Sequence, residues 1–233
     1  MSASGTRPGR PAANARPLRQ IMARAIDMGL SASGLLIMWP VIAIIAVAVR
    51  LDSRGPIFYR QRRVGLNRRA STSPALNGTR RAADCGGRPF DIYKFRTMTV
   101  TAEHDSGPVW SSRNDARITR VGRWLRDYRL DELPQLLNVL KGDMAIVGPR
   151  PERPDIAVSL ASEVPDYRRR HRVLPGITGW AQVHRGYDTS VDDVRKKLGY
   201  DLEYIENQSV ALDVRIMLMT VPVVLRGRAF SRN

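Results

Sequence analysis

An acidic pair in a leucine-rich segment is the first feature of this sequence that could do chemistry. Asp131 and Glu132 lie in LDELPQLLNVLKGDM, residues 130–144. One interpretation is structural, because an aspartate at the N-cap and a glutamate in the first turn both complement a helix dipole. The other is chemical, because adjacent carboxylates can bind Mg²⁺ and a carboxylate can attack phosphorus to give an acyl phosphate. The N–H groups of a helix N-terminus also suit a phosphate-bearing substrate.

Several basic residues have a spacing that suits contact with phosphate. Arg150 lies between two prolines in VGPRPERP, residues 147–154, which holds it on a stiff extended segment. A rigid arginine favours bidentate phosphate contact, although a solvated arginine on a proline-rich connector gives the same pattern. Lys94 and Arg96 share one face of a predicted strand that would contact either phosphate or solvent. Arg126 precedes the acidic pair by five residues.

The overall composition indicates anionic partners. The 233 residues include 38 Lys and Arg against 22 Asp and Glu, which gives a formal net charge of +16. Nucleic acid, anionic lipid headgroups and phosphorylated substrates all fit such a charge. The single cysteine, Cys85, excludes an internal disulfide framework and a cysteine-based zinc site. The three histidines do not fall at metal-ligand spacing.

A hydrophobic segment near the N-terminus predicts membrane association. Residues 30–49 hold no charged residue, and a helix of that length rises about 30 Å, one bilayer core. Pro40 should kink this helix. Arginines flank both ends, whereas positive charge normally marks only the cytoplasmic side. The residues alone leave two topologies open, a kinked spanning helix and a hairpin that returns to the same face.

Hydrophobic spacing predicts the elements around the acidic pair. Residues 115–128 and 190–206 are expected to form helices, and a short strand is expected within residues 90–100. A further helix is expected to start with Asp131 at its N-cap and to end at Gly142.

Four other segments have a distinctive composition. Residues 1–19 are typical of a disordered basic arm, and residues 68–86 of an inserted loop. Residues 175–183, PGITGWAQV, indicate a turn-rich corner. The apolar tail at 216–225 is too short to span a membrane and suits the interface.

The motifs occur in an order that resembles the bacterial sugar transferase family. The series is RQRRVG (60–65), KFRTM (94–98), the segment 130–154 and PGITGWAQV (175–183), after a proline-broken apolar segment. The resemblance covers residues 20–228. Family members are monotopic phosphoglycosyl transferases. They move a sugar-1-phosphate from a nucleotide diphosphate sugar to a membrane polyprenyl phosphate with Mg²⁺, as the first membrane step of glycoconjugate or exopolysaccharide synthesis.

The resemblance implies roles for individual residues. Asp131 matches the family's nucleophile, which forms a covalent phosphosugar intermediate, and Glu132 completes a dyad that binds Mg²⁺ with it. The helix dipole and nearby arginines are expected to keep Asp131 ionised. Substrate-binding positions are expected at Lys94, Arg96, Arg126, Arg150 and Asp201.

The resemblance also implies an architecture. It predicts a mainly helical α+β fold with a re-entrant membrane hairpin at 20–50 and a small cytoplasmic catalytic domain at 51–233 with interfacial amphipathic helices. The protein would be monotopic on the cytoplasmic face of the inner membrane and contact membrane lipid but no nucleic acid; a homo-oligomer is left open. Two departures stand out. Trp39 replaces the serine that several relatives have before the proline, and the loop 68–86 is inserted.

Two other functions compete with this interpretation. A membrane-tethered module that binds polyanions without catalysis fits the charge of +16, but the sequence has no familiar DNA- or RNA-binding motif. A lipid-linked phosphatase with an aspartate nucleophile would instead release free sugar phosphate. The sequence predicts neither the sugar nor the nucleotide.

Overall fold

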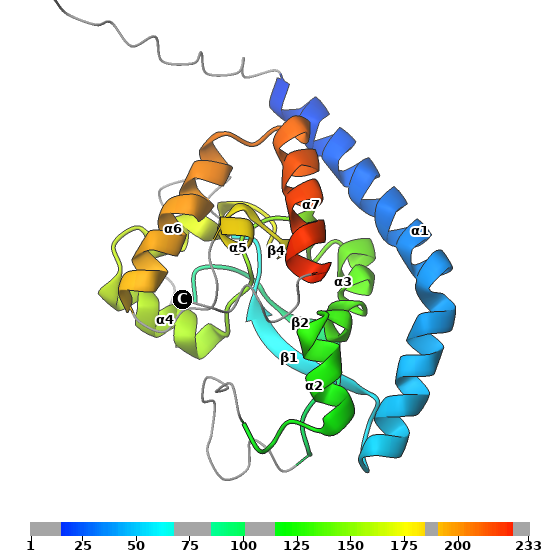
Figure 1. Ribbon diagram of the computed structural model, residues 1–233. Coiled ribbons are helices and arrows are strands. Elements are labelled where there is room, and N and C mark those ends of the chain that lie inside the picture. Colours follow the sequence, from blue (N-terminus) through cyan, green and yellow to red (C-terminus); the bar gives the residue numbers. More distant parts are fainter. Residues whose placement is uncertain (1–14, 68–84, 101–114, 185–190, 226–233) are drawn as a thin grey trace, which may run out of the picture.

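The computed structural model describes residues 15–67, 85–100, 115–184 and 191–225, with the backbone alone for 15–17 (Figure 1). Helices dominate and two small sheets accompany them, which confirms a mainly helical α+β fold. The α-helices are α1 (Ala15–Asp52), α2 (Arg120–Asp127), α3 (Gln135–Lys141), α4 (Pro154–Glu163), α5 (Trp180–His184), α6 (Val191–Glu206) and α7 (Val210–Leu225). Two 3₁₀ helices are η2 (Leu130–Glu132) and η3 (Tyr167–Arg172). The strands are β1 (Phe58–Val64), β2 (Pro89–Phe95), β3 (Ala145–Val147) and β4 (Gly176–Thr178).

Helix α1 is one continuous element of 38 residues along one side of the molecule (Figure 1). It begins at Ala15, so the last residues of the predicted basic arm are helical; residues 1–14 lie outside the described part. The helix also continues through Pro40. The hairpin expected at this proline is therefore not confirmed. From Leu18 to Asp52 the helix is long and apolar enough to cross a membrane, with a mean hydropathy of 2.4 over an 18-residue stretch.

Both ends of α1 are bound to the same body. Arg24 donates to two carbonyls at the end of α3, at 2.6 and 3.0 Å, and Asp27 accepts a backbone N–H of β3 at 3.0 Å. At the other end, Asp52 accepts an N–H from the first turn of α2 at 3.0 Å. Ile45 and Val49 are buried against β2 and α2. The helix thus lies along the rest of the protein instead of projecting from it.

The two sheets are small and separate. β1 and β2 pair antiparallel, with Phe58 opposite Phe95, and β3 pairs parallel to β4, with Ala145 opposite Gly176. The short strand predicted within residues 90–100 is therefore confirmed as β2, which ends at Phe95, so Arg96 lies just beyond it.

The predicted helices agree with the structure to different degrees. The helix at 190–206 is confirmed as α6 over its described residues. The helix expected over 115–128 begins only at Arg120, because the Thr119 hydroxyl accepts the N–H of Gly122 at 3.0 Å and caps it there.

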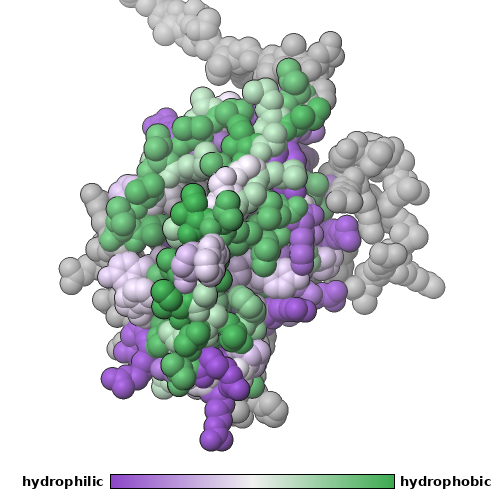
Figure 2. All heavy atoms as spheres, turned by 90° about the vertical axis from the view of Figure 1, so that its right-hand side faces the viewer, coloured by the Kyte–Doolittle hydropathy of each residue, from purple (hydrophilic) through white to green (hydrophobic). Residues whose placement is uncertain are grey.

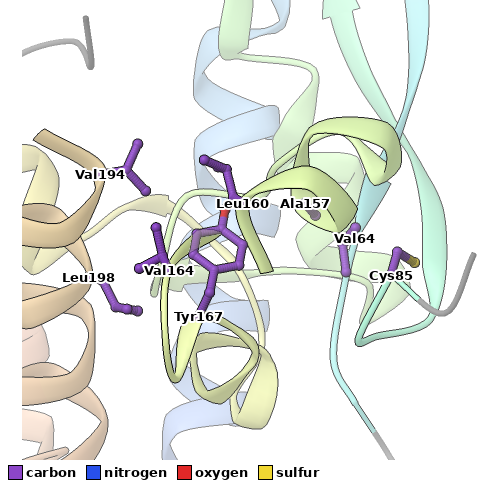
Figure 3. Packing of buried hydrophobic residues seen from close by; sticks show 8 residues of the cluster. All are labelled: Val64, Cys85, Ala157, Leu160, Val164, Tyr167, Val194 and Leu198. Atoms are coloured by element: carbon purple, nitrogen blue, oxygen red, sulfur yellow. The ribbon is translucent and has the colours of Figure 1, made fainter. Parts of the chain in front are cut away.

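A buried cluster joins β1, α4, η3 and α6 (Figure 3). It contains Val64, Cys85, Ala157, Leu160, Val164, Tyr167, Val194 and Leu198. Cys85 belongs to the end of the predicted insertion, so this end of the loop is part of the core. The remainder of the insertion, residues 68–84, lies outside the described residues.

The outward face of α1 is apolar. Figure 2 shows hydrophobic side chains gathered over this helix, and Leu36, Trp39 and Ile44 are each more than 60% exposed. The apolar tail predicted to be interfacial forms the second half of α7, where Leu218 is 67% exposed. An apolar surface of this extent is typical of contact with a membrane or a partner.

Candidate active site

The acidic pair lies in the 3₁₀ turn η2, so the N-cap predicted at Asp131 is wrong. Arg129, with a left-handed φ of 55°, makes the turn from α2 into this segment. Pro134 then prevents a continuous helix, because it has no N–H for the carbonyl four residues earlier and its ring clashes there. Helix α3 starts only after this proline and ends at Gly142, with a φ of 83°, as the sequence predicts.

Glu132 is held by two cations, Lys94 and Arg150. Its carboxylate is buried and accepts a hydrogen bond from the Lys94 Nζ at 3.0 Å. Arg150 forms an ion pair with the same carboxylate and donates a second hydrogen bond through Nη1 at 3.3 Å. Burial raises the pKa of Glu132, but the charges of Arg150 and Lys94 outweigh it and hold that pKa well below its usual value. Glu132 is therefore ionised and held in place.

Asp131 is in the opposite situation. It is also buried, yet in the described part of the chain no hydrogen bond or ion pair holds its carboxylate. Burial raises its pKa, as does the charge of Glu132, and the charges of Lys94, Arg126 and Arg150 only partly oppose this. The charges of the nearby arginines act in the direction that the sequence predicts, since they favour the ionised form of Asp131, but burial has the larger effect on its pKa. The structure leaves a buried carboxylate whose pKa is raised and which has no hydrogen-bond or ion-pair partner among the described residues.

Arg126 approaches the pair from α2. Its Nε donates to the Thr97 hydroxyl at 2.8 Å, and its charge acts on Asp131. The structure thus brings Lys94, Arg126 and Arg150 together around the dyad, from three separate segments.

The segment of Arg150 is fixed by backbone contacts. The carbonyl of Pro149 accepts the N–H of Gly176 at 3.0 Å, and the carbonyl of Arg150 accepts a bond from the Arg170 Nη2 at 3.0 Å. Gly148 and Gly176 lie so close that a Cβ on either would collide with the backbone of the other. The segment 175–183, predicted to be a turn-rich corner, therefore holds the strand that leads to Arg150.

Two predicted substrate-binding residues contact other parts of the protein. Arg96 is only 5% exposed, and its guanidinium donates to the Val49 and Ser53 carbonyls at the end of α1. Asp201 is buried in an ion pair with Arg170 at 2.8 Å, and Arg170 is in turn bonded to the backbone of Arg150. Asp201 is thus linked to the dyad through Arg170 and Arg150. Arg96 instead stabilises the C-terminal end of α1.

Sequence reasoning missed two positioning residues, Arg170 and Asn138. Asn138 is fully buried in α3; its Oδ1 accepts the Tyr93 N–H at 3.0 Å and its Nδ2 donates to the Asp91 carbonyl at 2.7 Å. These bonds fix the strand that carries Lys94 against the segment that carries the dyad. The sequence did contain a signal for Asn138, because it is a polar residue inside a leucine-rich stretch.

Replacing Asn138 with leucine should destabilise the protein by about 2–4 kcal/mol, because two backbone groups of β2 lose a fully buried hydrogen-bond partner. Activity should fall as well, since Lys94 loses its position. Urea denaturation in detergent micelles measures the first effect. Leu137→Asn on the exposed side of the same helix is the matched control and should change stability little. Equal stability of Asn138→Leu and wild type would contradict the positioning role.

The dyad fits magnesium better than a metal that needs an all-protein cage. In the described segments, no group of three or more His, Cys, Asp or Glu side chains could hold a metal ion. Mg²⁺, however, is usually bound by one or two carboxylates together with water and substrate phosphates. The carboxylate of Asp131, which has no hydrogen-bond or ion-pair partner among the described residues, has the chemistry of such a ligand, and Glu132 is its neighbour in sequence.

Comparison with known proteins gives a consistent result. A family model described as "Bacterial sugar transferase" matches residues 18–227. A "UDP-glucose:undecaprenyl-phosphate glucose-1-phosphate transferase" of Xanthomonas campestris pv. campestris is 41% identical over 208 residues, which cover 88% of this chain and 39% of the relative. A "UDP-N-acetylgalactosamine-undecaprenyl-phosphate N-acetylgalactosaminephosphotransferase" of Aeromonas hydrophila is 39% identical over 91% of this chain and 45% of its own length.

A shorter relative matches nearly end to end. The "Exopolysaccharide production protein PSS" of Rhizobium leguminosarum bv. phaseoli is 38% identical over 216 residues, 90% of this chain and 98% of the relative. The chain thus spans less than half the length of the Xanthomonas and Aeromonas relatives and nearly all of this one.

Proposed function

The chain belongs to the bacterial sugar transferase family, and on this basis we propose that it transfers a sugar-1-phosphate from a nucleoside diphosphate sugar to a membrane polyprenyl phosphate. One observation carries the proposal. Of two adjacent buried carboxylates, Glu132 is held by Lys94 and Arg150, whereas Asp131 has no such partner among the described residues. Two carboxylates that only bound a metal or only capped a helix would not need such different surroundings. A nucleophile does need a carboxylate without such a partner, here next to a carboxylate that holds two cations in place.

In the first step, a carboxylate oxygen of Asp131 attacks the β-phosphorus of the donor. The bond from the β-phosphorus to the bridging oxygen breaks, and the nucleoside monophosphate leaves. The sugar phosphate remains on Asp131 as an acyl phosphate. Arg126 and Arg150 hold phosphate oxygens during this step, and their fixed positions reduce the cost of reorganisation.

In the second step, a phosphate oxygen of the polyprenyl phosphate attacks the same phosphorus. The carboxylate of Asp131 leaves, and the product is a polyprenyl diphosphate sugar. Glu132 stays bound to Lys94 and Arg150 throughout and keeps both cations at the reacting phosphate.

Magnesium would be held by Asp131 and, through its remaining lone pairs, by Glu132. When bound, it supplies charge neutralisation on the diphosphate.

We infer that the protein lies on the cytoplasmic face of the inner membrane and does not cross it. Both ends of α1 are bonded to one body, as the Arg24 and Asp52 contacts show, and a straight crossing would place these ends on opposite faces. The outward faces of α1 and α7 are apolar, and Trp124 and Tyr128 on α2 are exposed beside the dyad. Aromatic residues of this kind favour the headgroup region, where a lipid phosphate acceptor is found.

Incubation of purified protein with donor and acceptor tests the proposed reaction. UDP-glucose and UDP-N-acetylgalactosamine are the first donors to try, because the names of the relatives specify them. We expect release of UMP that requires a divalent cation, stops with EDTA, and yields a lipid-linked diphosphate sugar. A polyanion-binding module would release no UMP, and a phosphatase would release sugar phosphate without the lipid. Either outcome would contradict the proposal.

Cysteine labelling tests the topology. Single cysteines at positions 10 and 60, in a Cys85→Ala background, should both react only from the cytoplasmic side, because Arg-rich segments flank both ends of the apolar run. A membrane-impermeant maleimide applied to spheroplasts and to inverted vesicles gives the two readouts. Reaction of either position from the periplasmic side would show a spanning helix. Pro40→Leu is expected to favour that outcome, since it supplies the backbone N–H that proline lacks inside α1 and so favours a straight helix.

A further inference from the structure

A cavity of about 660 Å³ lies away from the dyad, between the first half of α1, strand β3 and the start of α7. None of the residues assigned to the transfer reaction lines it. A volume of this size falls in the range of small-molecule sites, which is about 300–1,000 Å³.

The walls of the cavity are mainly apolar and belong to the two helices with exposed apolar faces. Ile26 of α1 and Val214 and Met217 of α7 line it. Outside the cavity, α1 exposes Ile21 and α7 exposes Leu218, each 67% accessible. Figure 2 shows hydrophobic side chains gathered over α1. An apolar chain from a bilayer in contact with these faces could therefore continue into the cavity without crossing a polar surface.

The charges along the cavity favour an anion. Arg19, Arg24 and Arg172 line it, against Asp27 and Asp213. Arg24 donates hydrogen bonds to carbonyls of α3, and Asp27 accepts one from a backbone N–H. Asp213 forms an ion pair with Arg19 at 3.9 Å. Arg172 is exposed and forms no hydrogen bond or ion pair with any residue that the structure describes, and the Arg19 Nε is buried without an acceptor. Two guanidinium donors thus remain at the edge of an apolar cavity.

We propose that this cavity binds one phosphate-bearing lipid, with its phosphate at Arg172 and Arg19 and an apolar chain between α1 and α7. The chemistry is shared by two sources, an anionic phospholipid of the bilayer and a polyprenyl phosphate. The site is distinct from the dyad, and the proposal does not depend on the transfer reaction.

Lipid retention by the full-length protein tests the proposal. Protein in detergent micelles is mixed with dioleoylphosphatidylglycerol, or with dioleoylglycerol, which has the same chains without the phosphate, and the retained lipid is counted by native mass spectrometry. Wild type should retain one phosphatidylglycerol per chain at concentrations where dioleoylglycerol is not retained.

Two variants, each with a matched control, locate the site. Ala23→Phe fills the cavity from α1, whereas Ala25→Phe places the same ring on an exposed position that does not line it. Arg172→Gln removes the exposed guanidinium, and Lys196→Gln removes one charge from the exposed side of α6. Each cavity variant should lower lipid occupancy about tenfold. Arg172→Gln removes one charge-assisted contact with the phosphate, and Ala23→Phe takes up the space of the lipid's apolar chain. The controls should retain the lipid.

The outcome decides between binding in the cavity and general adhesion. Equal retention of both lipids, or equal loss in Ala23→Phe and Ala25→Phe, would overturn the proposal. Competition identifies the source. Displacement of phosphatidylglycerol by a lower concentration of a C55 polyprenyl phosphate assigns the cavity to an acceptor-type lipid, and the reverse order assigns it to a bilayer phospholipid.

Discussion

Asp131→Asn should abolish turnover, with a loss of at least about a thousandfold, because the amide cannot attack phosphorus. The side chain keeps its size, and the described structure shows no ion pair or hydrogen bond of Asp131 that the change would break. The loss should therefore appear with the fold intact.

The same variant should be more stable than wild type at neutral pH. Burial raises the pKa of Asp131 in the folded protein. A carboxyl with a raised folded pKa opposes folding when it is ionised, and this cost disappears as the pH falls below the folded pKa. Asparagine is neutral at every pH, so the variant should show a higher apparent Tm at pH 7.5 and little difference at low pH.

Mass spectrometry separates the nucleophile from other roles. Wild type incubated with donor and Mg²⁺ but without acceptor should carry a sugar-phosphate adduct on the peptide that contains Asp131, and the steady-state kinetics should be ping-pong. Asp192→Asn, on an exposed aspartate of α6, is the matched control and should retain both activity and adduct. An adduct in Asp131→Asn, or sequential kinetics with no adduct in wild type, would contradict the covalent mechanism. The proposal that the protein catalyses the overall transfer reaction would still stand.

Glu132→Gln should impair activity severely and, unlike the first variant, should also destabilise the fold. Glu132 is buried between Lys94 and Arg150, and glutamine would leave two cations without their anion. Removal of one partner from a buried ion pair costs about 3–5 kcal/mol. Activity should fall about a hundredfold or more, because both cations lose their fixed positions beside the substrate phosphate.

The pH dependence of this effect has a definite sign. The folded pKa of Glu132 lies well below its usual value, so its contribution to stability is present above the unfolded pKa and is lost as the pH falls through the folded pKa. The stability difference between wild type and Glu132→Gln should thus be full at neutral pH and shrink only in strong acid.

Chemical denaturation at several pH values measures this difference. Glu206→Gln is the matched control, because Glu206 pairs with Arg169 on the surface and should contribute less than about 1 kcal/mol. An unchanged stability of Glu132→Gln at pH 7.5 would show that Lys94 and Arg150 do not depend on this carboxylate. We expect Asp131→Asn to raise stability, Glu132→Gln to lower it, and both to lose activity. A dyad with a purely structural role would not produce this combination.

The sequence by itself determined the local features of this protein. The apolar run of α1, the helix α6 and the strand β2 follow from hydrophobic spacing, which acts over a few residues. The left-handed end of α3 at Gly142 follows from one residue type. Ordered motifs were also sufficient to indicate the family, since they need no knowledge of contacts.

Local rules failed where two of them compete. The dyad was predicted at a helix start because Asp131 is a good N-cap, but Pro134 interrupts the helix and leaves the pair in a 3₁₀ turn. At Pro40 the helix α1 is likewise not divided, so the hairpin expected there is not confirmed, and α1 is bonded to the body on both sides of that residue. In each case the outcome depends on contacts made by the neighbouring residues.

Only the tertiary structure decided which charged residues form the site. Glu132 meets Lys94 across 38 residues of sequence and Arg150 across 18, whereas Arg96, two residues from Lys94, caps the end of α1. The physical reason is that an ion pair and a pKa depend on distance and burial, which the packing of separate segments sets. Two carboxylates adjacent in sequence therefore obtained opposite environments, Glu132 as an anchored anion and Asp131 as a carboxylate without such partners among the described residues.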